Sequence, residues 1–163
     1  MDYLTTLDLG PSSPVLRYAT LADVPAIVAL LAADQLGAAR DGADSDAELR
    51  PYKEAFAAID RDPAHLLVVA EADRQVIATL QLSFLPGLAR RGALRAQIEA
   101  VRVAEAWRSR GLGAAMITWA ISEARRRGSA LVQLTSDKSR GGAHRFYEQL
   151  GFVASHEGYK LRL

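Results

Sequence analysis

The sequence predicts an α/β domain in which a mixed, mainly antiparallel sheet is flanked by about four helices. Two runs of strand-forming residues, Leu66–Glu71 and Val76–Phe84, are separated by turn-forming residues, as in a β-hairpin. A third strand-like run, Ile98–Val103, leads through a turn with two glycines into an apolar-periodic helix that ends near Arg127. Along this run the even-numbered residues are expected to face one side of the sheet and the odd-numbered residues the other. Strand-like segments outnumber helical ones along the 163 residues, which favours a single sheet and a single core.

The chain is expected to begin with an arm and then a strand. Residues 1–14 contain Gly, Ser and Pro and are predicted to form a loosely held N-terminal arm, with crossing to a partner subunit as the alternative. Residues 15–163 are predicted to form one domain. It starts with a strand over Val15–Ala19, and a helix follows because Thr20 or Asp23 can cap it.

A polar loop from Gln35 to Asp46 is expected to separate this helix from a second one, which runs from about Ala47 to Ile59. Pro51 places the start of the second helix near itself, because proline is tolerated in a first turn but not in a helix interior. The carboxylates of the loop either attract a cationic amine or are simply solvated. The later predicted elements are a strand at Ala130–Thr135, a helix at Ala143–Leu150, and strands at Phe152–Ser155 and Tyr159–Leu163.

The glycine turn after Val103 has the composition of an anion site. Gly111 and Gly113 allow the backbone to approach a phosphate closely, and the first turn of the following helix offers unbonded N–H groups at its positive end. Arg108 and Arg110 add positive charge, and the planar guanidinium can bond two phosphate oxygens. A tight turn with surface arginines before a core helix is the alternative interpretation.

The motifs of this stretch resemble those of a known family. Arg108-Ser109-Arg110-Gly111-Leu112-Gly113 fits R-x-x-G-x-G/A, the pyrophosphate loop of the GNAT superfamily of acyl-CoA-dependent N-acyltransferases. A V-x-V strand precedes it, and F-Y-E-x-L-G-F follows at Phe146–Phe152. The resemblance extends over roughly 15–163 and is most specific from 98 to 152. It implies a GNAT-like fold with splayed central strands, so that residues 15–163 would form an N-acetyltransferase domain.

The resemblance also implies acetyl-CoA as co-substrate and suggests where it binds. The pyrophosphate would lie on backbone N–H groups of the glycine turn, and a bulky residue at Gly113 would block it. The pantetheine arm would run beside Val101–Val103, where the Val101 N–H would polarise the thioester carbonyl, although both valines are also ordinary core residues. The implied cofactor-binding residues are Val101, Val103, Arg108, Arg110, Gly111, Leu112, Gly113 and Ala114.

Two side chains are candidates for proton transfer. The family commonly has a tyrosine near the thioester sulfur, which here corresponds to Tyr147; its hydroxyl can donate a proton or a hydrogen bond, and the alternative is a core aromatic. Glu99 interrupts an apolar strand, where partial burial would raise the pKa of its carboxyl and suit it as a base for the amine. The alternative for Glu99 is a structural salt bridge with an arginine of a neighbouring strand.

One position departs from the family pattern. Many relatives have an asparagine three residues before the alanine of the short helix, where this chain has Arg140 before Ala143. The sequence leaves the role of Arg140 open. The histidines at 65, 144 and 156 lack metal-ligand spacing, so no metal is expected.

Composition narrows the class of protein further. A formal net charge of +1 gives no reason to expect a nucleic-acid partner, and the absence of cysteine excludes a thiolate nucleophile or disulfide. The sequence lacks a membrane-length apolar run and a secretory leader pattern, so a cytoplasmic protein is expected.

The predicted activity is transfer of an acetyl group from acetyl-CoA to a primary amine by direct attack in a ternary complex. The acceptor is expected to be a small-molecule amine, with a protein amine as the alternative, and a homodimer is possible by analogy. A non-catalytic acyl-CoA-binding sensor or regulatory module is the competing function. The sequence does not identify the amine.

Overall fold

The computed structural model describes residues 3–10, 13–33, 37 and 40–163. Within these residues, six strands form one sheet in the order β1 to β6, antiparallel throughout except for the parallel pair β5–β6. The expected mixed, mainly antiparallel sheet is therefore confirmed. The elements are β1 (Tyr3–Thr6), β2 (Val15–Tyr18), the 3-10 turn η1 (Leu21–Asp23), α1 (Val24–Ala32), α2 (Asp46–Arg61), β3 (His65–Ala72), β4 (Gln75–Leu85), α3 (Ala89–Gly92), β5 (Arg95–Val103), the 3-10 turn η2 (Glu105–Trp107), α4 (Leu112–Arg126), β6 (Leu131–Leu134) and α5 (Gly141–Gln149).

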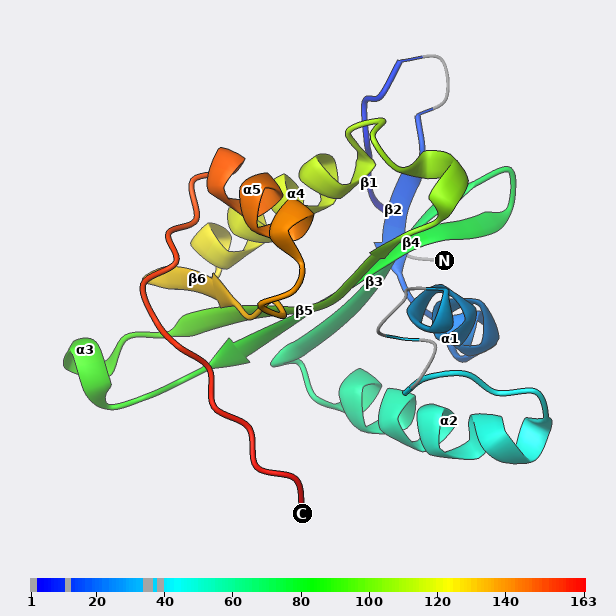
Figure 1. Ribbon diagram of the computed structural model, residues 1–163, viewed down its shortest axis with the longest axis horizontal. Coiled ribbons are helices and arrows are strands. Elements are labelled where there is room, and N and C mark those ends of the chain that lie inside the picture. Colours follow the sequence, from blue (N-terminus) through cyan, green and yellow to red (C-terminus); the bar gives the residue numbers. More distant parts are fainter. Residues whose placement is uncertain (1–2, 11–12, 34–36, 38–39) are drawn as a thin grey trace.

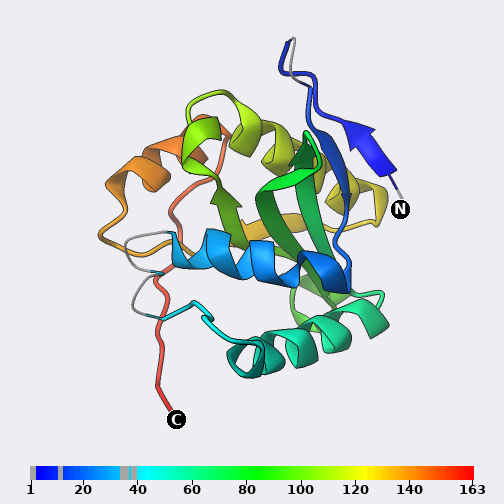
Figure 2. The ribbon, with the colours of Figure 1, turned by 90° about the vertical axis from the view of Figure 1, so that its right-hand side faces the viewer.

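Helices cover both faces of the sheet (Figures 1 and 2). Helix α4 packs on β4, β5 and β6, and the aromatic residues of α5 join the same larger core. Helices α1 and α2 pack against each other and against β4 and β3 on the other face. The larger core includes Leu16, Leu80, Leu82, Ile98, Leu112 and Met116, and the smaller one Val24, Ile27, Val28, Phe56 and Val69.

Local signals account for the hairpin and for α2. Asp73 and Arg74, with φ angles of 50° and 62°, turn the chain between β3 and β4, and the predicted hairpin is confirmed. Helix α2 begins at Asp46, close to the expected start at about Ala47, and the Ser45 hydroxyl caps it by accepting the Glu48 N–H at 3.3 Å. Pro51 lies inside α2, so the predicted start near Pro51 was wrong.

The N-terminal residues differ from the loosely held arm that composition suggested. Tyr3–Thr6 pairs with β2 as an added edge strand. Leu7 is buried in the larger core, and its N–H donates to the Pro14 carbonyl at 2.8 Å. The division into an arm (1–14) and a domain (15–163) stays a prediction. Of the predicted polar loop, Gln35 and the neighbouring Asp34 lie outside the described residues.

A β-bulge changes the alternation expected for β5. Ala100 has a φ of 53°, and the register with β4 shifts between Thr79 and Gln81. Strict alternation would put Ile98 and Val103 on opposite faces, but both contact the larger core. The predicted facing of residues 98–103 was therefore wrong beyond Glu99, because the extra residue of a bulge reverses the facing of the residues after it.

A buried ionic network joins β2, β3 and η1 below α1. The Arg17 guanidinium bonds both carboxylate oxygens of Asp23, at 2.7 and 2.9 Å, and a Glu71 oxygen at 2.6 Å. Burial alone would raise the pKa of Asp23, but its hydrogen bonds with Arg17 and Thr20 outweigh burial and lower it. The network holds the start of α1 against the sheet.

The predicted strands at Phe152–Ser155 and Tyr159–Leu163 are absent from the structure. These residues follow α5 as an extended chain without sheet partners, and their backbone leaves the body of the molecule (Figure 1). In the part of the chain that the structure describes, no helix combines the length and apolarity needed to cross a bilayer.

Candidate active site

The turn between β5 and α4 leaves the first backbone N–H groups of α4 without a partner inside the helix. Gly111, with a φ of 83°, occupies the N-cap position of α4. The Ala115 N–H is the first to bond back, to the Gly111 carbonyl at 2.9 Å. The N–H groups of Leu112, Gly113 and Ala114 therefore have no acceptor within the helix, as the sequence predicted for an anion site. The Leu112 side chain is fully buried in the core and fixes the helix below the turn.

The two glycines of the turn serve different structural purposes. At Gly111 the left-handed φ is unfavourable for any residue with a Cβ, and the added atom would lie 3.4 Å from Leu9 of the arm. At Gly113 the backbone is ordinary, and a Cβ would lie 3.5 Å from Phe146 and 3.7 Å from Val103. A side chain at Gly113 would therefore meet these protein atoms first, and the expectation that a bulky residue there blocks the pyrophosphate stays a prediction.

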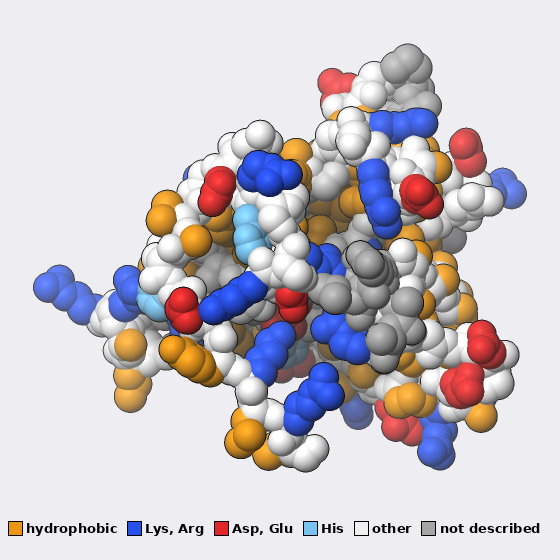
Figure 3. Space-filling model, in the orientation of Figure 1, with side chains coloured by type: hydrophobic (Ala, Val, Ile, Leu, Met, Phe, Trp, Pro, Cys, Tyr) orange, Lys and Arg blue, Asp and Glu red, His pale blue; other side chains and the backbone are white. Residues whose placement is uncertain are grey.

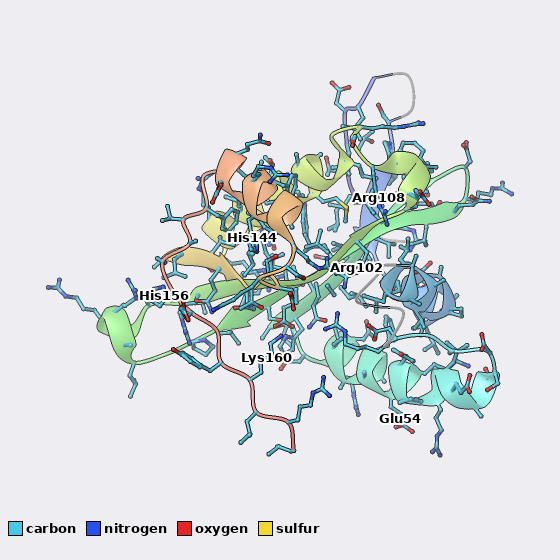
Figure 4. The ribbon with its side chains drawn as sticks, in the orientation of Figure 1. Glu54, Arg102, Arg108, His144, His156 and Lys160 are labelled. Carbon is cyan, nitrogen blue, oxygen red and sulfur yellow. The ribbon has the colours of Figure 1, made fainter. Side chains whose placement is uncertain are left out.

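The two arginines of the turn are exposed but bonded to the protein. The Arg108 Nε donates to the Val103 carbonyl at 3.2 Å, and the Arg110 guanidinium lies over the Trp107 ring at 5.5 Å. Figure 4 shows Arg108 in the segment that leads to α4. Both guanidinium groups therefore stay beside the turn and add positive charge to it.

The strands β5 and β6 separate beyond Ile98. Their pairing runs from Arg95 opposite Leu131 to Ile98 opposite Leu134, and β5 then continues alone on that side to Val103. Among the described residues, no strand pairs with this edge of β5 after Ile98. The splayed strands implied by the resemblance are thus present, and the free edge leads directly to the glycine turn.

Tyr147 projects from α5 into the aromatic part of the larger core. Its ring meets Phe146 edge-on at a centroid distance of 5.2 Å and Phe152 at 5.9 Å. Burial raises the pKa of Tyr147, and the charges of Arg102 and Arg140 partly oppose that rise. Because Phe146 also faces Gly113, the structure brings α5 next to the glycine turn and the end of β5.

Glu99 lies on the opposite face of β5 from this aromatic cluster and is exposed. It was expected to be partly buried, and this expectation was wrong because Glu99 points away from the core, in register with Gln81 of β4. Within the described residues, Glu99 forms no ion pair, so the structural salt bridge offered as the alternative is not observed.

One arginine that motif reasoning did not single out, Arg102, lies near Tyr147. Figure 4 places Arg102 on β5 between α5 and α1, and its Nη1 donates to the Val101 carbonyl at 2.8 Å. Lys and Arg side chains gather over the middle of the same face (Figure 3). The position of Arg102 between the two valines of the V-x-V strand could have marked it as a site residue. Strict alternation, however, predicted the wrong side of β5 for its side chain.

The loop before α5 is held together by its own side chains. Asp137 accepts hydrogen bonds from the Ser139 N–H and hydroxyl, which lower the pKa of its carboxyl, and Arg140 and Arg40 add to this effect. His144, on α5, bonds the Asp137 carbonyl oxygen at 2.8 Å. His144 is therefore part of this loop's scaffold. The described residues contain no group of His, Asp and Glu arranged to hold a metal.

Two hollows of the surface lie away from this arrangement. One, of about 170 Å³, lies between the end of α2 and the start of β3 and includes Asp62 and His65. The other, of about 420 Å³, lies between α1 and the segment before α2 and includes Asp44. Neither is lined by Glu99, Tyr147 or the glycine turn. The candidate site is instead an open surface between the splayed strands.

Comparison with known proteins identifies the family. The model of the acetyltransferase (GNAT) family matches residues 30–152, which is most of the chain. The chain belongs to the GNAT family. Its similarity to aminoalkylphosphonate N-acetyltransferase of Salmonella typhimurium (strain LT2) is 26% identity over 141 residues, covering 86% of each protein.

Solved structures of GNAT-like fold agree with this assignment. A structure described as a transcriptional regulator from Bacillus halodurans C-125 has a TM-score of 0.88 and 42% identity, over 92% of this chain and 99% of its own. A putative acetyltransferase from Agrobacterium tumefaciens str. C58 has a TM-score of 0.79 and 29% identity, over 91% and 99%. As a GNAT member the chain is an acyl-CoA N-acyltransferase, and members of this family use acetyl-CoA.

Proposed function

We propose that this protein transfers an acetyl group from acetyl-CoA to a primary amine of a small molecule, by direct attack in a ternary complex. The observation that carries the proposal is the free edge of β5, which runs from Ile98 to Val103 and ends at the glycine turn, with Tyr147 on the helix packed beside that turn. This arrangement offers one continuous surface for a long, thin, phosphorylated carrier.

The residues present fit acetyl-CoA. The unbonded N–H groups of Leu112, Gly113 and Ala114 would hold the pyrophosphate, and Arg108 and Arg110 would add charge to it. The backbone of Val101 to Val103 would bond the pantetheine amides as a neighbouring strand would. In this role the side chains of both valines remain core residues, consistent with their contacts to the larger core.

Tyr147 is the proposed proton donor to the sulfur. When the amine nitrogen bonds to the acyl carbon, the carbon–sulfur bond breaks and the thiolate takes up a proton. Burial raises the pKa of Tyr147, which keeps its hydroxyl protonated and able to donate at neutral pH. The nearby charges of Arg102 and Arg140 would stabilise the tyrosinate left after donation.

Glu99 is the proposed acceptor of the amine proton. Glu99 is exposed on the face of the sheet opposite α4. Its carboxylate can therefore accept the amine proton through a bridging water molecule. The absence of an ion pair at Glu99 among the described residues supports this role over a structural one. The position of Arg140, where relatives often carry asparagine, would serve Tyr147 through its charge.

The class of amine is proposed from the relatives. The similarity to a protein named for aminoalkylphosphonate acetylation makes a small amine with an anionic group the first acceptor to test. The acidic segment before α2, including Asp41 and Asp44, would instead suit a polycation. An aminoalkylphosphonate and a polyamine therefore belong together in one panel.

The test combines cofactor binding with turnover. Acetyl-CoA should raise the melting temperature, because it binds only the folded state. Arg110→Ala should reduce the shift, while Arg125→Ala, an exposed arginine at the far end of α4, should leave it intact. Thiol release with at least one amine of the panel should follow. Absence of any thermal shift at millimolar acetyl-CoA would refute the proposal.

A sensor is the second candidate function, because a relative at 42% identity is described as a transcriptional regulator. The two candidates differ in the outcome of the same experiment. A sensor would show the thermal shift without thiol release, and Tyr147→Phe would then change neither measurement. An enzyme would show both, with thiol release lost in the variant.

A further inference from the structure

The loop between β4 and β5 carries an exposed leucine and two exposed arginines near its tip. Residues 86–94 connect the two strands, and within them Leu88 is 97% exposed and Arg90 and Arg91 are exposed. This loop, which contains α3, projects beyond the end of the sheet (Figure 1), and Lys or Arg side chains extend outward there (Figure 3). A single exposed leucine is common on protein surfaces, so its surroundings decide whether it has a role.

The backbone near this tip adopts a conformation that its residues disfavour. Arg90, Arg91 and the following Gly92 have φ angles of 54°, 61° and 75°. Glycine adopts such values freely, whereas each arginine does so at a cost in free energy. Side-chain packing does not offset that cost, because both arginines are exposed and a Cβ on Gly92 would meet no atom within 4 Å. Strain that the fold itself does not require is found most often at functional sites.

A second group of arginines lies beside the base of this loop. Residues 125–127 are three consecutive arginines at the end of α4. The Ala130 N–H donates to the Leu94 carbonyl at 2.8 Å, and Leu131 is in register with Arg95. The chain that leaves α4 therefore runs along the base of the loop, and the two arginine groups flank the same end of the sheet.

This end of the molecule, residues 84–95 and 123–131, is here named the basic end. It contains six arginines and one acidic residue, a formal charge of +5, whereas the whole chain has +1. The acidic residue, Glu123, pairs with Arg126 and Arg127 at 2.7 and 2.8 Å. The other four arginines form no ion pair within the part of the chain that the structure describes. Positive charge is therefore concentrated around the exposed Leu88.

We propose that the basic end docks the protein on an anionic lipid surface, with Leu88 entering the interface and the arginines binding phosphate groups of the lipid heads. The guanidinium can bond two phosphate oxygens, and its apolar stem can lie in the interface while its charge stays in water. The affinity of a peripheral protein for a membrane is the sum of its buried apolar area and its attraction to anionic lipids. The basic end supplies both contributions.

Two observations favour lipid over nucleic acid as the polyanion. Contacts with a nucleic-acid backbone reward positive charge and give no role to Leu88 at the projecting tip. Unpaired bases stack on exposed aromatic side chains, but Phe84, the one aromatic residue in the sequence of the basic end, is only 5% exposed. The combination of an exposed aliphatic tip with surrounding arginines is the one that a membrane interface accommodates.

Docking in this way would leave the candidate active site open to solvent. Strand β5 begins at Arg95, within the basic end, and finishes at Val103, shortly before the glycine turn. The nine residues of this strand place its two ends about 25 Å apart. The glycine turn would therefore stay accessible to acetyl-CoA while the protein is bound to lipid. The proposal rests on the basic end and holds whether or not the protein acetylates amines.

The first experiment measures co-sedimentation of the wild-type chain with lipid vesicles at low ionic strength. The protein should bind vesicles that contain phosphatidylglycerol and should bind far less to vesicles of phosphatidylcholine alone. Added salt should release it, because salt screens surface charges. Absence of binding to the phosphatidylglycerol vesicles at low salt would overturn the proposal.

The second experiment locates the surface with two matched substitutions. Arg74 is also an exposed arginine with a left-handed backbone, at a φ of 62°, but it lies in the hairpin turn at the opposite end of β4. Arg91→Gln should weaken vesicle binding by about fivefold, the effect of one basic residue near an anionic surface. Arg74→Gln should leave binding nearly unchanged. Equal losses in the two variants would show adsorption through overall charge and would contradict docking by the basic end.

The third experiment uses Leu88→Gln, which removes the apolar tip and keeps every charge. Vesicle binding should fall several-fold, while the melting temperature and its increase with acetyl-CoA should match those of the wild type. Unchanged vesicle binding in this variant would show that Leu88 does not enter the interface and would overturn the proposal. Displacement of the wild-type chain from vesicles by duplex DNA at equal phosphate concentration would assign the basic end to nucleic acid instead.

Discussion

Two glycines in one turn should respond to alanine in opposite directions. Gly111→Ala puts a Cβ on a residue with a φ of 83°, which costs about 1–2 kcal/mol for an L-residue. The contact of 3.4 Å with the flexible end of Leu9 adds little, since that side chain can move. Gly113→Ala occupies ordinary space 3.5 Å from Phe146, and alanine in a helix gains up to about 1 kcal/mol over glycine.

The melting temperature separates the two substitutions. At about 2–4 °C per kcal/mol for a chain of this size, Gly111→Ala should lower it by about 2–8 °C and Gly113→Ala should raise it by up to about 4 °C. Gly113→Val is the third variant, because its extra methyl groups would meet Phe146 and Val103 at once. We expect it to displace α5 and weaken acetyl-CoA binding indirectly, while Gly113→Ala keeps that binding.

The outcome that would refute this reasoning is specific. If Gly111→Ala has the same melting temperature as the wild type, the left-handed backbone at residue 111 does not disfavour a residue with a Cβ by the expected 1–2 kcal/mol, about the value for an L-residue. If acetyl-CoA no longer raises the melting temperature of Gly113→Ala, the ligand approaches residue 113 from the direction of the added Cβ. Contact with the ligand, and not packing against Phe146, would then explain why glycine is needed at this position.

The remaining predictions concern two acid–base groups and the buried network. Tyr147→Phe should lower kcat by roughly tenfold or more with unchanged acetyl-CoA binding by calorimetry; an unchanged kcat, with chemistry rate-limiting, assigns the ring to packing. Glu99→Gln should leave stability unchanged, because the side chain is exposed, and its kcat/KM should recover at high pH while the wild type levels off; parallel pH profiles exclude the base role. Asp23→Asn removes one partner of buried Arg17 and should cost about 3–5 kcal/mol in urea unfolding at pH 7. Because the pKa of Asp23 is lowered on folding, the wild-type advantage is present above its unfolded pKa of about 4 and is lost as pH falls through the folded pKa; a difference that persists at low pH would contradict this assignment.

Local patterns predicted much of this fold. The hairpin of β3 and β4, the glycine turn before α4 and the end of α4 near Arg127 depend on short-range chemistry, and the structure contains all three. Helix α4 ends as expected near Arg127, where Gly128, with a φ of 76°, donates its N–H to the Arg125 carbonyl. The family was also recognisable, because its motif uses backbone geometry that only a few residues allow.

The errors come from effects that sequence spacing does not contain. A bulge at Ala100 changed the facing of every later residue on β5, so Arg102 and Val103 exchanged sides. The cap at Ser45 sets the start of α2, and the helix continues through Pro51 although a proline there removes one backbone hydrogen bond and its ring crowds the carbonyl of the preceding turn. Glu99 was expected to be partly buried because its neighbours are apolar, but its side chain points away from the core that they enter. The strand-like sequences at 152–163 pair with no strand in the structure, and alternation alone does not establish a pairing partner.

The N-terminal residues have a consequence for proteolysis. Leu9 reaches the glycine turn at Gly111, and Leu7 is buried in the same core that supports α4. A protease that cuts between Leu9 and Val15 would separate these supports from the rest of the chain without touching any residue proposed to contact acetyl-CoA. The cleaved protein would keep its sheet from β2 onward, but the glycine turn before α4 would lose its apolar contacts with the N-terminal residues. Proteolysis of the N-terminal residues would thus inactivate the protein by loosening the packing of the glycine turn, without removing any residue that binds the cofactor.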